Sequence, residues 1–189
     1  MAASAGGFLT ACSKGKPEFR GVDISEVEYA RDIALTDHNG QPRSLKDFRG
    51  KVVVVFFGYT QCPDVCPTTL QEMAEVKKML GKDGDKLQSI FVTVDPERDT
   101  LDMLKAYMGN FDPTFLALRG TPEQTAAVAK DFKIYYKKVD GKTPTSYTMD
   151  HSAGSYIYDT QGRLRVYYRY GSGAEALATD VKILLKEAG

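Results

Sequence analysis

Two cysteines, Cys62 and Cys66, stand four positions apart, directly after an apolar run at residues 52–57 and directly before a helical pattern. The N-terminus of a helix favours negative charge, because its backbone N–H groups lack partners and its dipole is positive there. A thiol in that position therefore has a lowered pKa and a larger thiolate fraction. Thiolates bind soft metal ions and also attack disulfides. The pair thus indicates metal or redox chemistry rather than a disulfide that staples the fold.

The four-residue spacing of the cysteines favours metal binding over redox chemistry. Residues at i and i+4 on a regular helix have Cβ atoms about 5–6 Å apart, whereas a relaxed disulfide needs about 3.5–4.5 Å. An ion between two sulfur atoms bridges the wider gap more comfortably. A disulfide can still form if the first helical turn is irregular, and Pro67 favours irregularity because it disfavours helical geometry at Cys66. Both chemistries therefore stay open.

Two cysteines supply half of a closed four-ligand zinc site, and the chain has only two histidines, His38 and His151, so the inventory of further ligands is short. Two thiolates and one imidazole suit copper instead, since thiolate is soft enough for Cu(I) and imidazole is acceptable to both oxidation states. His151 lies between a loop-rich segment (138–150) and a strand, where a ligand can reach the functional edge of a sheet. His38 adjoins an Asn-Gly turn and is expected to be a solvated loop residue. A lone histidine is also often structural, so the residues alone leave the role of His151 open.

The surrounding pattern predicts an α/β fold with a mixed sheet. Residues 52–57 are apolar on both faces, as in a buried central strand, and the segment after the cysteines carries apolar residues at helical spacing. The element order matches a thioredoxin-like fold: a central mixed sheet flanked by helices, an N-terminal strand extension, and a C-terminal β-hairpin plus helix. The predicted strands are 29–36, 52–57, 89–94, 114–118, 154–158 and 164–170; the predicted helices are 67–81, 101–109, 121–132 and 174–187, with a short turn or helix at 44–48.

Composition bounds the function further. A chain of 189 residues with 42% hydrophobic residues favours one domain with a sizeable core. Lys plus Arg and Asp plus Glu number 25 each, so a zero net charge gives no reason to propose a nucleic-acid partner. The longest apolar run, 52–57, is too short to cross a bilayer.

The third cysteine, Cys12, follows Leu-Thr-Ala, which is typical of the lipidated cysteine at the end of a bacterial lipoprotein signal. Residues 1–8 lack a basic region and are too short for a whole signal peptide. We therefore expect residues 1–25 to be a truncated signal remnant with a flexible linker (13–25), and residues 26–189 to be the domain. The native protein would then be anchored outside the cytoplasmic membrane through Cys12. The alternative is a chance cysteine in a tail.

Three motifs together resemble the Sco/SenC family. They are the string Phe-Gly-Tyr-Thr-Gln-Cys-Pro-Asp-Val-Cys-Pro-Thr at 57–68, Val-Asp-Pro-Glu-Arg-Asp-Thr at 94–100, and Asp-His-Ser at 150–152. The resemblance spans about residues 28–187, with the motifs in the family's order. The first two are highly specific in combination, whereas the Asp-His pair is weak alone.

The resemblance implies a membrane-tethered thioredoxin-like domain that faces the periplasm or an equivalent compartment. It implies one copper ion, Cu(I) with Cu(II) also accepted, bound by Cys62, Cys66 and His151. Family members help to assemble the dinuclear copper centre of cytochrome c oxidase, as copper donors, as thiol reductants, or both. The implied partners are the copper-receiving oxidase subunit and another periplasmic copper chaperone.

Acidic neighbours of these residues have two interpretations. Asp64 could tune copper or dock a partner, but a carboxylate is simply favoured in the first helical turn. Asp150 could orient or balance the imidazole, or it could be solvated. Asp95 and Asp99 are expected to cap and brace their loop.

Two other functions compete with a metallochaperone, which would not itself be an enzyme. A thiol-disulfide oxidoreductase would use the same dithiol. Enzymes of the thioredoxin type use CxxC spacing, however, and typically have a cis-proline at the point just before the strand predicted at 154–158; this chain has no obvious proline there, and His151 occupies that neighbourhood. A peroxiredoxin-like peroxidase shares the fold class, but two close thiols and a copper-compatible histidine argue against it.

Overall fold

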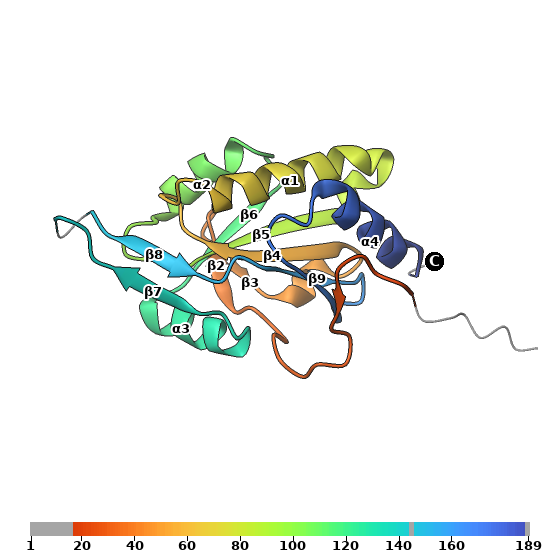
Figure 1. Ribbon diagram of the computed structural model, residues 1–189, viewed down its shortest axis with the longest axis horizontal. Helices are drawn as coiled ribbons and strands as arrows, with labels where there is room; N and C mark the ends of the chain where they lie inside the picture. The colour runs from red at the N-terminus through yellow and green to blue at the C-terminus, as the bar shows by residue number, and fades with distance from the viewer. Residues whose placement is uncertain (1–16, 144–145, 188–189) are drawn as a thin grey trace, which may run out of the picture.

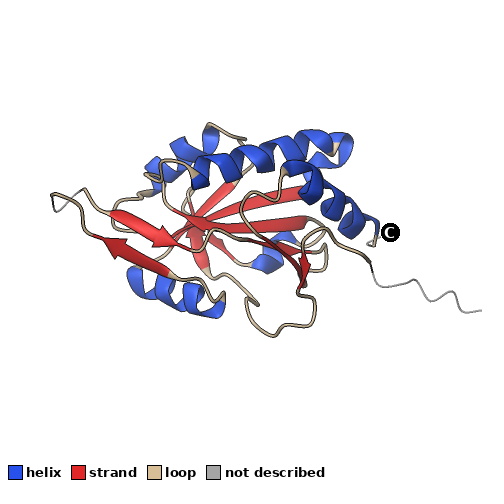
Figure 2. Ribbon diagram, viewed as in Figure 1, coloured by secondary structure: helices blue, strands red, loops and turns tan. Residues whose placement is uncertain are grey.

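An eight-stranded mixed sheet and a separate two-stranded ribbon organise the chain (Figures 1 and 2). The structure is a computed structural model that describes residues 17–143 and 146–187. The sheet strands are β1 (Val22–Asp23), β2 (Leu35–Asp37), β3 (Pro42–Arg43), β4 (Val52–Gly58), β5 (Leu87–Thr93), β6 (Leu116–Arg119), β9 (Ser155–Tyr158) and β10 (Leu164–Tyr168); the ribbon is β7 (Tyr136–Val139) with β8 (Thr148–His151). The helices are α1 (Val65–Met79), α2 (Leu101–Gly109), α3 (Pro122–Asp131) and α4 (Ala174–Lys186), with 3₁₀ helices at Leu45–Phe48 and Gly81–Lys86.

The strand order of the main sheet is β1-β10-β9-β4-β5-β6-β2-β3. The central strand β4 runs parallel to β5 and antiparallel to β9, and all seven of its residues are buried. Helices cover both faces, which is why β4 is apolar throughout instead of alternating. The predicted α/β thioredoxin-like class with a central mixed sheet is confirmed.

The two faces of β4 form two cores. Side chains of a strand alternate between faces, so Val52, Val54 and Phe56 pack with α1, α2 and α4. On the opposite face Val53, Val55 and Phe57 pack toward Leu45–Phe48 and α3. The C-terminal end of β4, where α1 begins, is the place at which the two cysteines lie.

The C-terminal predictions agree closely with the structure. Strands β9 and β10 pair antiparallel, and the turn between them is closed by a hydrogen bond from the Asp159 N–H to the Arg163 carbonyl. Helix α4 comes next in the chain.

The helix predicted at 67–81 begins two residues earlier, at Val65, because Pro67 is tolerated in a first turn whose N–H groups have no intrahelical partner.

The strand predicted at 29–36 is wrong for most of its length, since only β2 (Leu35–Asp37) is formed. Ala30 has φ +53°, a left-handed conformation that no strand contains. Its carbonyl accepts a hydrogen bond from the buried hydroxyl of Tyr158 at 2.6 Å, and its N–H donates to the Asp131 carbonyl. These tertiary contacts hold the segment as an irregular loop.

The segment 138–150, for which the sequence predicts a loop, contains much of the ribbon instead. Strands β7 and β8 pair antiparallel, with Tyr136 opposite His151, and the ribbon extends past the main sheet (Figure 1). Most of its side chains are exposed, and Met149 alone on β8 is buried. The apolar alternation that identifies a strand is therefore missing from the sequence.

Part of the predicted linker, 13–25, lies against the domain. Phe19 packs on the core, β1 pairs with β10, and the buried Asp180 carboxylate accepts hydrogen bonds from the N–H groups of Arg20 and Gly21. Cys12 lies outside the described residues, and the boundary between residues 25 and 26 stays a prediction. Across 17–143 and 146–187, none of the helices has the length and apolar character needed to cross a membrane.

Candidate metal centre

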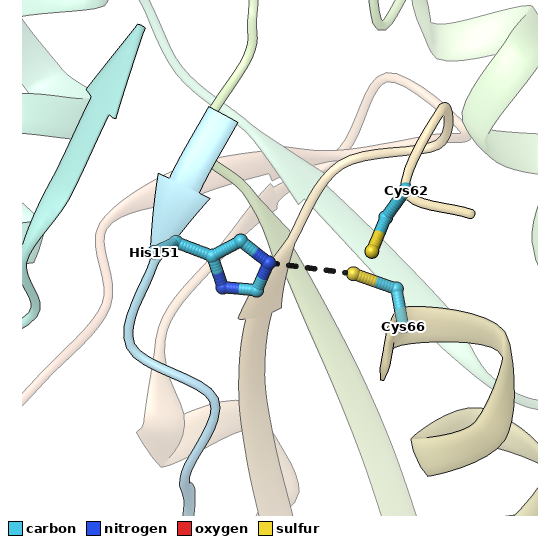
Figure 3. A group of neighbouring side chains, drawn as sticks. All are labelled: Cys62, Cys66 and His151. Atoms are coloured by element: carbon cyan, nitrogen blue, oxygen red, sulfur yellow. Dashed lines mark hydrogen bonds between the residues drawn. The ribbon is translucent and has the colours of Figure 1, made fainter. Parts of the chain in front are cut away.

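Three side chains from separate elements converge at the end of β4 (Figure 3). Cys62 comes from the loop after β4, Cys66 from the first turn of α1, and His151 from the last position of β8. Their ligand atoms all lie within 4.8 Å of one another, and Cys66 Sγ is 3.6 Å from His151 Nε2. The structure thus brings together the three residues singled out in the sequence. No other group of three or more such ligands is found among the described residues.

Cys66 is fixed by the packing of the first turn of α1. It is 0% exposed and belongs to the core cluster beneath that helix. Gly58 makes room for it, because a Cβ on Gly58 would lie 2.6 Å from Cys66 Sγ and 2.8 Å from Phe91. The close approach of strand and thiol therefore needs a glycine at the end of β4.

Cys62 lies outside the helix, in a turn closed by a hydrogen bond from its N–H to the Tyr59 carbonyl. The Cβ separation of a regular helix, assumed from the spacing, therefore does not describe this pair. A loop residue facing a residue in the first turn can bring its sulfur closer to its partner than two positions on one helix can. Both cysteines are free thiols, Cys62 half-exposed and Cys66 buried.

His151 is aimed at the thiols by the alternation of β8. Residues two positions apart on a strand share a face, so His151 points the same way as Met149, which is 8% exposed and packs into the core. The ring of His151 meets the ring of Tyr59 edge-on, with centroids 5.9 Å apart, and lies 6.2 Å from that of Phe56. Met149 anchors the strand, and the two aromatic rings orient the imidazole.

The backbone also selects which ring nitrogen of His151 faces the cysteines. Nδ1 lies 3.0 Å from the Ser152 carbonyl oxygen, and a carbonyl can only accept, so Nδ1 must carry the proton. In the neutral ring Nε2 is then the nitrogen with a lone pair, and Nε2 is the atom that faces Cys66. A carbonyl that fixes the tautomer in this way is usual for metal-binding histidines.

The two thiols differ in acidity. A hydrogen bond from the Cys66 thiol lowers the pKa of Cys62 to about 5, helped by the backbone N–H groups of Asp64 and Cys66 and opposed by partial burial. The same hydrogen bond, together with burial, raises the pKa of Cys66. Cys62 is consequently the first thiolate, at a position that solvent reaches.

This asymmetry predicts the pH profile of alkylation in the reduced, metal-free protein. Iodoacetamide should modify Cys62 before Cys66, and its rate should rise through about pH 5 and level off near neutrality, because the thiolate is the nucleophile. Peptide mass mapping of the modified cysteine against pH checks this. In the Cys66→Ala variant the donor is lost, and the midpoint should move up toward that of an ordinary thiol. An unchanged midpoint in that variant would show that Cys66 does not set the acidity of Cys62.

The acidic neighbours lie in different surroundings. Asp64 and Asp150 are both exposed; Asp64 accepts a long hydrogen bond from Thr68, and Asp150 lies opposite Lys137 on the ribbon. Their roles in tuning the site stay predictions. Asp99 is buried and accepts hydrogen bonds from the N–H and hydroxyl of Thr60 and from the Thr93 hydroxyl, which confirms that it braces its loop.

His38 is not simply solvated, as the sequence suggested. It is half-buried, and its Nδ1 accepts a hydrogen bond from the Ala117 N–H at 3.2 Å. Burial lowers its pKa. His38 thus has a structural role at the edge of the sheet, apart from the cysteines.

The donor set fits a soft ion. When two sulfur atoms each lie about 2.3 Å from one ion, the distance between them is at most about 4.6 Å. The three ligand atoms already lie within 4.8 Å of one another, which is close to that distance. Two thiolates and one imidazole, without a further cysteine or histidine in the group, match the preferences of copper better than the closed four-ligand site of structural zinc.

The site residues that the sequence did not reveal are Gly58, Tyr59 and Arg98. Gly58 and Tyr59 stand just before the cysteine motif, and a glycine at the end of a buried strand is a usable signal of close approach. Arg98 lies inside the second motif, but its hydrogen bonds to Gln61 and to the Tyr147 carbonyl join distant segments.

Comparisons with known proteins agree with this geometry. Residues 23–186 match the family model described as SCO1/SenC. A structure of Bradyrhizobium japonicum ScoI with copper bound is 44% identical, with TM-score 0.74 over 81% of this chain and 97% of that chain. A SCO1/SenC family lipoprotein from Bacillus anthracis is 27% identical, with TM-score 0.72 over 88% of this chain and 99% of that chain.

One of the similar proteins is mitochondrial. The mouse mitochondrial SCO2 homolog is 36% identical over 153 residues, which is 80% of this chain. The chain spans 60% of the length of that protein. With the family model matching most of its length and the three clustered residues at the family's motifs, the chain belongs to the SCO1/SenC family.

Proposed function

We propose that this protein is a copper metallochaperone that delivers one copper ion to the dinuclear copper centre of cytochrome c oxidase. Cys62 Sγ, Cys66 Sγ and His151 Nε2 hold the ion. The observation that carries the proposal is the convergence of two thiols and one correctly oriented imidazole within 4.8 Å. The copper-bound ScoI relative supports the same assignment.

The exposure of the ligands suits transfer. Cys66 is buried, whereas Cys62 and His151 are half-exposed, so one side of the ion would face solvent. A thiolate of the partner can then enter on that side and displace one ligand at a time. Cu(I) keeps its oxidation state in such a ligand exchange, and each thiolate released takes up a proton.

A second candidate function, reduction of the partner's cysteines, is favoured by the half-exposed free thiol of Cys62 beside the buried free thiol of Cys66, and a lowered pKa of Cys62 would support it. The Cys62 thiolate attacks one sulfur of the partner's disulfide and releases the other as thiolate. Cys66, once deprotonated, then attacks Cys62 in this mixed disulfide and frees the partner. The net change is a reduced partner and a Cys62–Cys66 disulfide.

The proposed location is the outer face of the cytoplasmic membrane, with a lipid anchor on Cys12. The Leu-Thr-Ala-Cys sequence supports it, as does the lipoprotein among the relatives. Radiolabelled fatty acid should enter the native protein and be lost in Cys12→Ser. Equal incorporation in both proteins would contradict the anchor.

A transfer assay tests the main proposal and separates the two functions. The full chain, loaded with one equivalent of Cu(I), is mixed with the reduced, copper-free domain of the oxidase that receives copper. Copper should move to that domain, and His151→Ala should change the transfer rate. If the chain binds copper but none moves, the metallochaperone assignment fails. Reduction of the oxidised domain by metal-free chain, without copper transfer, would favour the second function.

A further inference from the structure

One arginine joins the two halves of the metal centre. The side chain of Arg98, on the loop between β5 and α2, is 14% exposed. Its Nη1 donates to the Tyr147 carbonyl at 2.8 Å and to Gln61 Oε1 at 3.2 Å, and its Nε donates to the Asp95 carboxylate. A guanidinium has five donors in a rigid fork, so it can serve several acceptors at once.

The two acceptors of Nη1 adjoin the metal centre in the sequence. Gln61 immediately precedes Cys62, and Tyr147 immediately precedes β8, whose last residue is His151. The Arg98 side chain therefore ties the loop that carries one thiol to the strand that carries the imidazole.

The contact with Tyr147 is reinforced by several neighbours. The guanidinium carbon of Arg98 lies 3.5 Å from the centroid of the Tyr147 ring, a stacked cation–π arrangement. The Tyr147 hydroxyl donates to Asp95 at 2.7 Å, so Arg98 and Tyr147 share one carboxylate. Arg98 also lies 5.7 Å from the centroid of the Tyr59 ring, the ring that meets His151 edge-on.

The ribbon depends on such contacts because, within the described part of the chain, no strand of the main sheet pairs with it. Met149 packs into the core, and Lys138 of β7 forms an exposed ion pair with Glu97 at 3.6 Å, but exposed pairs stabilise little. Both thiols, by contrast, sit on elements anchored to the central strand. The histidine is held by the β7–β8 ribbon, which is a separate sheet in the described part of the chain.

We propose that Arg98 is a positioning residue that holds β8 against the cysteine loop, so that His151 faces the thiols before any metal binds. The arrangement lowers the cost of ordering the third ligand when an ion arrives. The positioning role of Arg98 rests on the proposed copper function only in those measurements that use copper as the readout.

Loss of Arg98 should affect the three ligands unequally. The thiols should keep their places, while His151 is no longer held. Cu(I), which two thiolates satisfy, should lose little affinity, whereas Cu(II), which favours imidazole, should lose more. A merely destabilising substitution would weaken both alike.

The test compares Arg98→Gln with Arg119→Gln in the full chain. Arg119 is the matched control, because it donates from both Nε and Nη2 to the Pro96 carbonyl of the same loop and so braces that loop without reaching the ribbon. In metal-free protein, hydrogen exchange of the amides of β7 and β8 should rise at least about tenfold in Arg98→Gln, with those of β4 unchanged. Arg119→Gln should leave the ribbon's exchange unchanged.

Copper gives the second readout. Cu(II) affinity of Arg98→Gln should fall about 10–100-fold, the usual loss when a group that orients a metal ligand is removed. Added to His151→Ala, the same substitution should cause no further loss, since both act through the imidazole. Arg98→Lys keeps the positive charge but lacks the planar guanidinium, so it should show the same changes to a smaller extent. It replaces Arg98→Gln in both measurements if that variant does not fold.

Unchanged ribbon exchange in a folded Arg98 variant would overturn the proposal, and so would additive losses with His151→Ala. If the wild-type chain bound no copper, the proposed function would fail, while the exchange measurement would still decide the role of Arg98.

Discussion

Cys66→Ala should abolish tight Cu(I) binding, the largest functional effect that we expect from a single substitution. The variant removes a ligand that no neighbouring group can replace, because Cys66 is enclosed by the core and the remaining donors are Cys62 and His151. Loss of a group that only supports a metal ligand lowers metal affinity about 10–100-fold. Loss of the ligand itself should therefore lower the Cu(I) affinity by more than that. Competition with a Cu(I) chelator measures the change.

Cys12→Ser is the matched control, since it also removes one cysteine but leaves the three clustered residues intact. It should bind one copper with wild-type affinity. A Cys66→Ala protein that still binds one copper as tightly as wild type would show that copper is held elsewhere.

Gly58→Ala should damage both stability and copper binding. The added Cβ would lie 2.6 Å from Cys66 Sγ, 2.8 Å from Phe91 and 3.1 Å from Phe56, so the thiol or an aromatic ring must shift. Overpacking of this kind costs about 1–3 kcal/mol of unfolding free energy. Since a displaced Cys66 no longer faces His151 correctly, copper affinity should fall as well. Urea unfolding and chelator competition measure the two effects.

Gly109→Ala provides the control for adding a methyl group. Gly109 is the last residue of α2, and nothing lies within 4 Å of its added Cβ. This variant should be as stable as wild type or slightly more stable, because alanine favours helix. If Gly58→Ala were equally harmless, the close fit between the end of β4 and Cys66 would not be a requirement of the site.

The central architecture could be predicted from the sequence because its signals are local. The run at 52–57 is β-branched and apolar on both faces, which is typical of a buried central strand, and the helical spacing after Cys66 located the start of α1 within two residues. The thiols stood out by type and spacing. His151 was identified with them through the resemblance to Sco/SenC proteins, since 85 residues separate it from Cys66 and no local pattern joins them.

The features that could not be predicted depend on tertiary contacts. Ala30 adopts a positive φ because Tyr158 and Asp131 bind its backbone, although its sequence is typical of a strand. The β7–β8 ribbon is held through Met149 and Arg98 instead of an apolar face. Cys62 lies before α1, so the Cβ separation of a regular helix does not apply to the pair; the helix start predicted at residue 67 already pointed the same way.

The central claim is that one copper ion is bound by two thiolates and one imidazole. X-ray absorption at the copper edge tests it most directly, on the full chain loaded with one equivalent of Cu(I). We expect two sulfur atoms and one imidazole nitrogen around the metal, with the nitrogen lost in His151→Ala and one sulfur lost in Cys62→Ala. A copper environment of nitrogen and oxygen alone, or one unchanged by these substitutions, would contradict it.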